Sequence, residues 1–425
     1  MNTIKKITLS NGLRLILAHQ PSSLAATVLI LVEAGSEYET KRTNGLSHFL
    51  EHMMFKGTKN RPKASMIAEE LAGLGAQSNA FTGQQYTGYW AKVQSRKVMN
   101  ILEIVSDMYL NPLFKAEEIE PERGVIIEEI NLYEDTPTRR VHDFFMTLLY
   151  GDQPAGWDIG GRKEVIRKLS RNDFVKYRRA HYIAPATVVA VAGNFNERAV
   201  VRAIRKLFGP LPRGKKGKKP PTSESQRRPG VFVKFKESDQ SHLVLGTRAF
   251  DIFDKRKYAI QVLADVLGGG MSSRLFERVR EKLGAAYYVR AEVDLSLDHG
   301  YFCVSAGVNH QKIEKVIFII LEEMKRMKKE LVPPAELRRS KDHITGNLIL
   351  SLETSDELAG FYGGQEIVTK KFVAPERYIK EIQNVSAEEI RRVAAQIFTD
   401  AKLNLAVIGP YKKPDSFKKL LTLGS

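Results

Sequence analysis

Two histidines bracket a glutamate in the segment "GLSHFLEHMMFKG", which covers residues 45–57. On a helix, His48, Glu51 and His52 project from one stripe because they are three and four residues apart. The opposite stripe is apolar and consists of Leu46, Phe49, Leu50, Met53 and Met54. The H-x-x-E-H pattern predicts a metal-binding face, although a solvated polar face or a hydrogen-bonded helix pair would use the same letters.

A catalytic zinc ion needs a third protein ligand and leaves a fourth position open for water. The segment "PERGVIIEEINLY", residues 121–133, is predicted to be helical with Pro121 in a tolerated first-turn position. At about 100° per residue, Glu128 points about 120° away from Glu122. The residues within about 60° of Glu122 are instead Val125, Ile126, Glu129 and Tyr133.

Glu122 and Glu129 therefore share the predicted buried stripe. Two carboxylates on an apolar face cost several kcal/mol unless a cation or strong donors compensate them. A zinc ion held by His48 and His52 would be a sufficient cation. Pairing of the two carboxylates with buried Lys or Arg is the alternative.

The order of these residues resembles that of the inverted zinc peptidases, which form the pitrilysin, insulysin and mitochondrial processing peptidase family. Within that family, the chain is similar to the short two-domain bacterial-type members. The motif is followed by a glutamate 77 residues after the second histidine (129 − 52), with another acid seven positions earlier. The resemblance runs over nearly the whole chain. It implies that His48, His52 and Glu129 bind one zinc ion per chain, that Glu51 is the base, and that Glu122 supports the ligands.

Two further stretches add to the resemblance. "SNAFTGQQYTGYW" is similar to the family's edge strand, where Asn79, Ala80 and Phe81 would pair with an extended substrate. An ordinary strand with an Asn-containing entry turn is compatible with the same letters. "SSRLFERVREKLGAAYYV" resembles the helix and strand that supply the family's Arg and Tyr pair, here Arg280 and Tyr287.

The chain of 425 residues is too long for one ordinary core and suits two domains. We expect an N-terminal zinc-binding catalytic domain over 1–212 and a homologous C-terminal domain without a metal site over 230–425. The basic Pro- and Gly-rich segment 213–229 is predicted to be a linker, with a polybasic binding arm as the alternative.

The two halves resemble each other in sequence. Ser170 and Ser386 begin similar segments and differ by 216 (386 − 170), as do Gly193 and Gly409 at their ends (409 − 193), which indicates an internal duplication. Strand-like segments such as "LRLILAH" and "YTGYWAKVQ" stand beside helical ones such as "VMNILEIVSDMYL". The expected fold is α+β, with a mainly antiparallel sheet and packed helices in each half. The resemblance implies that the halves form half of a clamshell chamber.

Composition excludes some classes of protein. With 43% hydrophobic and 27% charged residues and no long apolar run, the chain is neither disordered nor expected to insert into a membrane. The single Cys303 excludes an internal disulfide framework. The N-terminal segment has no apolar signal region, which predicts a cytoplasmic protein. A formal charge of +17 raises nucleic acid as a partner, but no motif for it is present, so none is expected.

These observations together predict a zinc metalloendopeptidase that cuts extended peptides or unfolded protein segments. A homodimer is implied by analogy with the family. The alternatives are a non-catalytic structural or assembly subunit of the same family and, more distantly, a basic nucleic-acid-binding protein.

Overall fold

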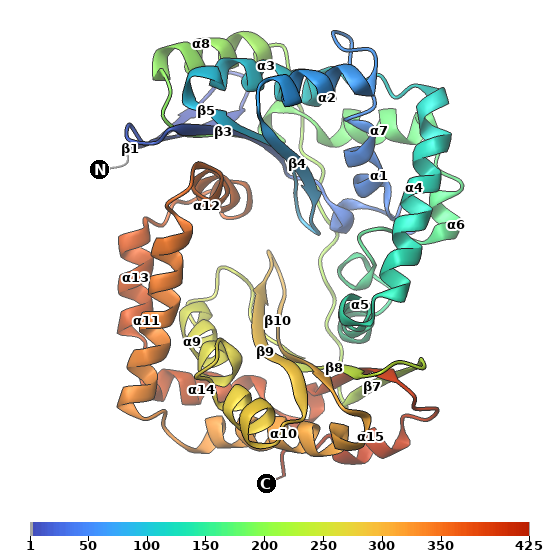
Figure 1. Ribbon diagram of the computed structural model, residues 1–425, viewed down its shortest axis with the longest axis vertical. Coiled ribbons are helices and arrows are strands. Elements are labelled where there is room, and N and C mark those ends of the chain that lie inside the picture. Colours follow the sequence, from blue (N-terminus) through green and yellow to red (C-terminus); the bar gives the residue numbers. More distant parts are fainter. Residues whose placement is uncertain (1–2, 425) are drawn as a thin grey trace. The chain divides into compact units, whose positions relative to one another are not determined.

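The computed structural model describes residues 3–424 and contains two compact units, each built on one sheet (Figure 1). Of the described residues, the first unit comprises those up to 130, together with 158–220 and 349–373. The second unit comprises 131–157, 221–348 and the described residues from 374 onward. The chain is therefore mixed α and β with two sheets and many helices, as the sequence predicted.

The first sheet has six strands in the order β1-β2-β6-β3-β5-β4, so β4 is an edge strand. All neighbouring pairs are antiparallel except β2 with β6. The strands are β1 (Thr3–Thr8), β2 (Arg14–His19), β3 (Ala25–Val32), β4 (Gln77–Thr82), β5 (Thr87–Gln94) and β6 (Thr187–Gly193).

Helices cover both faces of this sheet. Most of them share one core with Val28 and Ile30 of β3: α1 (Leu46–Met53), α2 (Ala64–Gly73), α3 (Val98–Leu110), α4 (Ala116–Asp135), α6 (Lys163–Ile166), α7 (Arg171–His181) and α8 (Glu197–Phe208). The opposite face, with Leu29 and Leu31, packs against α12 (Ser355–Val368) (Figure 1). Because both faces are covered, β3 is apolar at nearly every position rather than alternating.

The second sheet has five strands in the order β7-β11-β8-β10-β9, with only β7 and β11 parallel. These are β7 (Gly230–Phe235), β8 (Ser241–Arg248), β9 (Ala286–Leu295), β10 (Gly300–Val308) and β11 (Asn404–Gly409). One face of this sheet shares a core with residues of five helices: α9 (Lys257–Gly268), α10 (Ile313–Lys329), α13 (Pro375–Asn384), α14 (Ala387–Ile397) and α15 (Asp415–Leu420). Most of helix α11 (Pro334–Ser351) also belongs to this unit.

The other face of the second sheet packs against α5 (Pro137–Tyr150), through Val141, Phe145 and Leu149. Cys303 lies buried beneath this helix as a small apolar residue. Each unit thus contains a helix from the other half of the sequence: α5 in the second unit and α12 in the first. The compact units are for this reason not the contiguous ranges 1–212 and 230–425 expected from the sequence, because each sheet needs a cover for its second apolar face.

Residues 212–229, which include the predicted linker 213–229, form neither helix nor strand. The segment is nevertheless attached to the first unit, because Lys219 forms an ion pair of 2.9 Å with the buried Glu37, and Lys216 pairs with Glu33. No helix among the described residues is long and apolar enough to cross a bilayer.

The predicted repeat has a structural counterpart. Helix α7 starts at Arg171 and α14 starts at Ala387, a shift of 216 (387 − 171), and both helices begin with a capping box. The exchanged helices α5 and α12 start at Pro137 and Ser355, a shift of 218 (355 − 137). The two units therefore repeat one arrangement, including the helix that each takes from the other half of the sequence.

Candidate metal centre

The H-x-x-E-H segment forms the eight-residue helix α1, as predicted. Its apolar stripe is buried: Leu46, Phe49, Leu50, Met53 and the following Met54. His48, Glu51 and His52 are only partly buried and lie on the other face. The apolar face of α1 therefore packs into the core of the first unit, and its polar face, with the two histidines and Glu51, stays partly accessible.

Helix α4 differs in detail from the expectation. It starts at Ala116, so Pro121 lies inside the helix and not in its first turn. The buried stripe runs through Ile119, Glu122, Ile126 and Ile130, while Val125 is 50% exposed. The expectation for Val125 was wrong because the stripe is centred on the Ile126 side of Glu122. Glu129 is half-buried and Glu128 exposed, as the helical geometry predicted.

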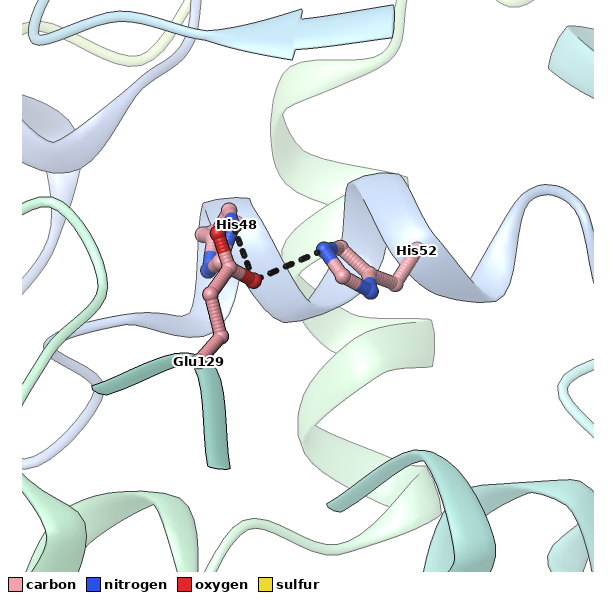
Figure 2. A group of neighbouring side chains, drawn as sticks. All are labelled: His48, His52 and Glu129. Atoms are coloured by element: carbon pink, nitrogen blue, oxygen red, sulfur yellow. Dashed lines mark ion pairs between the residues drawn. The ribbon is translucent and has the colours of Figure 1, made fainter. Parts of the chain in front are cut away.

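Helices α1 and α4 bring His48, His52 and Glu129 together (Figure 2). The Glu129 Oε2 atom lies 3.5 Å from Nε2 of each histidine. Ligands of a tetrahedral zinc ion at bonds of about 2.0 Å stand about 3.3 Å apart. The donor set, two imidazole nitrogens and one carboxylate oxygen on a partly open face, therefore fits a zinc ion in both chemistry and spacing.

Glu122 lies behind the ligands. Its Oε1 atom is 2.8 Å from Nδ1 of His52, which leaves Nε2 of that ring turned toward Glu129. Its Oε2 atom contacts Lys56. Burial alone would raise the pKa of Glu122, but the hydrogen bonds from His52 and Lys56 hold the pKa below its usual range. Lys56 was not predicted, because it lies in the turn after α1 ends at Met53, where helical spacing no longer indicates which way a side chain points.

Glu51 accepts a hydrogen bond of 2.6 Å from the hydroxyl of Thr82. Burial raises the pKa of Glu51 above its usual range, and the Thr82 donor opposes that shift. Thr82 is the last residue of β4, so the edge strand ends at the carboxylate of α1. Sequence reasoning stopped one residue short of it, at Phe81, and nothing in the strand pattern marks a threonine as a partner of Glu51.

The three predicted substrate-binding residues lie on β4, which pairs with β5 on one side only. Asn79 and Phe81 are exposed and Ala80 is half-buried. The backbone amide of Ala80 donates to the Asn79 side chain at 2.8 Å. An edge strand of this kind can accept an extended peptide as a further strand.

Arg280 and Tyr287 lie in the second unit. Arg280 is on a π-helical turn, η5 (Phe276–Lys282), with its guanidinium over the Phe276 ring, and it lines a cavity of about 510 Å³. Tyr287 is 75% exposed on the edge strand β9. The register of β9 shifts at this residue, because Gly307 pairs with Tyr288 and Val308 with Ala286. Such a bulge re-aims a side chain, and sequence alone did not predict it.

Comparison with known proteins identifies the family. Residues 14–161 match the family model "Insulinase (Peptidase family M16)", and residues 168–344 match "Peptidase M16 inactive domain". All three residues of the metal cluster lie in the first match.

Similar proteins match nearly the whole chain. The "Uncharacterized zinc protease YmxG" of Bacillus subtilis is 33% identical over 96% of this chain and 98% of its own length, and an "Uncharacterized zinc protease" of Rickettsia bellii is 35% identical over 95% and 96%. A protease from Helicobacter pylori has the same fold, with a TM-score of 0.89, 24% identity, and coverage of 96% of this chain and 100% of its own. The chain therefore belongs to peptidase family M16.

Proposed function

We propose that this protein is a zinc-dependent endopeptidase that hydrolyses extended peptides or unfolded protein segments. The observation that carries the proposal is the cluster of His48, His52 and Glu129 beside the carboxylate of Glu51, all held on two packed helices. The names of the relatives as zinc proteases support the same metal.

Three residues around the metal position have distinct roles in this proposal. Zinc, when bound, supplies a Lewis acid and makes hydroxide available near neutral pH. Glu51 accepts the proton of the attacking water and passes it to the leaving amine. Thr82 fixes the orientation of that carboxylate through the 2.6 Å hydrogen bond. Glu122 holds the His52 ring so that Nε2 faces the metal position.

Substrate binding follows from the same geometry. Because β4 ends at Glu51, a peptide that pairs with its free edge would carry its backbone toward the metal position. Arg280 and Tyr287 would donate hydrogen bonds to the substrate carbonyl or to the developing oxyanion. The placement of Arg280 and Tyr287 next to the metal site rests on the sequence and stays a prediction. The same holds for the homodimer and for the cytoplasmic location.

A non-catalytic subunit of the same family is the second candidate, because residues 168–344 match a domain described as inactive. That match covers the part of the chain that carries no H-x-x-E-H segment, whereas Glu51 and the cluster lie within the other match. Zinc binding without cleavage of any peptide would favour this candidate. Salt-sensitive binding to nucleic acid without cleavage would favour the basic nucleic-acid-binding alternative.

The decisive experiment separates metal binding from turnover. Glu51→Gln should retain about one zinc ion per chain and lose turnover by several orders of magnitude, because the base is removed and the ligands remain. Glu129→Gln should lose most of its zinc, and Glu128→Gln, which changes the adjacent exposed carboxylate, should keep both zinc and most activity. Loss of zinc from Glu51→Gln would instead place Glu51 among the ligands.

A further inference from the structure

Helix α1 begins without a cap from its own N-terminal residue. Gly45 occupies that position with φ 93° and has no side chain to accept a hydrogen bond. A Cβ atom there would lie 2.6 Å from the carbonyl oxygen of Gly160, so a capping Ser or Asp cannot replace it. The amide of Leu46 donates to the carbonyl of Thr43. The amides of Gly45 and Ser47 need another acceptor.

Glu39 provides that acceptor. Its Oε2 atom accepts from the Gly45 amide at 2.7 Å and its Oε1 atom from the Ser47 amide at 2.6 Å. The Asn44 side-chain amide donates to Oε2 at 3.3 Å. Glu39 is 3% exposed, and within residues 3–424 it forms no ion pair with a Lys or Arg. The backbone amides at the start of α1 are therefore the main groups that compensate the buried carboxylate of Glu39.

This arrangement is costly for a carboxylate. Burial raises the pKa of Glu39 to about 7, and the donors of Ser47, Gly45 and Asn44 only partly oppose the shift. On helix α7, the hydroxyl of Tyr177 hydrogen-bonds with the Ser47 hydroxyl at 2.7 Å and brings no positive charge to this cap. A neutral glutamine would avoid the cost of burying a charge. It could accept from only one of the two backbone amides, so a second acceptor oxygen is what the carboxylate adds at this helix start.

The backbone around Glu39 is anchored to the loop after β4. The turn η1 (Ser36–Tyr38) precedes it, and the amides of Ser36 and Glu37 donate to the carbonyls of Gly83 and Gln84 at 3.2 and 2.8 Å. Glu39 therefore connects the end of the edge strand to the first turn of α1, and that turn leads directly into the ligand His48.

We propose that Glu39 is a positioning residue of the metal centre, whose two oxygens fix the first turn of α1 and thereby the places of His48, Glu51 and His52. A glutamine of the same shape can offer only one acceptor oxygen and must turn its NH2 group toward the second amide donor. The helix start then shifts, and a metal site loses affinity when its supporting contacts move its ligands. The catalytic part of this inference rests on the proposed peptidase function.

The test compares Glu39→Gln and Glu39→Ala with Glu389→Gln in the full chain. Glu389 caps α14 in the second unit by accepting from the Ser386 amide at 2.8 Å, and α14 carries no residue of the metal cluster. Zinc affinity should fall about 10- to 100-fold in the two Glu39 variants, more in Glu39→Ala, and stay unchanged in the control. With Co²⁺ in place of zinc, the visible absorption spectrum should shift only in the Glu39 variants. On peptide substrates, kcat should fall with little change in KM.

Hydrogen exchange of the α1 amides provides a readout that needs neither metal nor substrate. Faster exchange at the start of α1 in Glu39→Gln, with wild-type exchange elsewhere, supports the inference. Wild-type zinc affinity, cobalt spectrum and α1 exchange in Glu39→Gln would overturn it. A wild-type chain that binds zinc but cleaves no peptide would refute the proposed function, while affinity and exchange would still decide the role of Glu39.

Discussion

Removing the carboxylate of Glu122 should weaken zinc binding by an amount that the structure allows us to work out. Glu122 is 4% exposed and its Oε1 atom lies 2.8 Å from Nδ1 of His52. A hydrogen bond that involves a charged group contributes about 1.5–3 kcal/mol, and a neutral one about 0.5–1.5 kcal/mol. Glu122→Gln should therefore cost about 1–1.5 kcal/mol, which is about a 5- to 12-fold weaker zinc affinity. Glu122→Ala should cost the whole contribution of about 1.5–3 kcal/mol, which is about a 12- to 140-fold weaker zinc affinity.

Competition with a chromogenic zinc chelator at one fixed pH measures these affinities directly. Glu128→Gln is the matched control, because it removes an exposed carboxylate from the same helix. The order of affinities should be wild type and Glu128→Gln first, then Glu122→Gln, then Glu122→Ala. Equal affinity in wild type and Glu122→Ala would show that His52 does not need this partner, and the reasoning from its Nδ1 contact would fail.

Three further predictions concern other residues. Thr82→Val removes the donor to Glu51 at nearly constant volume and should lower kcat/KM about tenfold with zinc content unchanged; wild-type kinetics would show that Glu51 is oriented without it. Tyr287→Phe should lower kcat/KM by about 10² or more with zinc content unchanged, and near-wild-type rates would mean that the family's role does not transfer. Burial raises the pKa of Glu39 to about 7 in the folded state, above its ordinary 4.5, so the folded wild type binds this proton more tightly than the unfolded chain. The free energy of unfolding of the wild type, relative to that of Glu39→Gln, should therefore rise by up to about 3 kcal/mol as pH falls from 8 to 5 in denaturant titrations. A difference that is constant with pH would contradict the raised pKa of Glu39.

Helical periodicity was sufficient for the parts of the site that are set within one element. The spacing of His48, Glu51 and His52 fixed their common stripe, and the angle between Glu128 and Glu129 distinguished two chemically identical neighbours. The same reasoning failed for Val125, because the neighbours of α4, and not its sequence alone, decide where the centre of the buried stripe lies.

Contacts between distant segments could not be predicted. The partnership of Thr82 with Glu51 spans 31 positions, and that of Glu39 with Ser47 depends on a turn held by the loop after β4. No periodicity links such residues, since their approach follows from strand order and helix packing. The bulge at Tyr287 belongs to the same class, because it is a property of the pairing between β9 and β10.

The helix that each unit takes from the other half of the sequence has a consequence for synthesis on the ribosome. The first two segments of the first unit are complete at residue 220, but α12 belongs to the segment that ends at residue 373, which is 153 residues later (373 − 220). At translation rates of about 5–20 residues per second, this interval lasts roughly 8–30 s. Until then the apolar sheet face with Leu29, Leu31 and Val188 lacks α12, the helix that packs against it in the finished fold. A nascent chain in this state is a substrate for chaperones and a target for aggregation, and the metal-binding unit is finished only when most of the second unit has also been made.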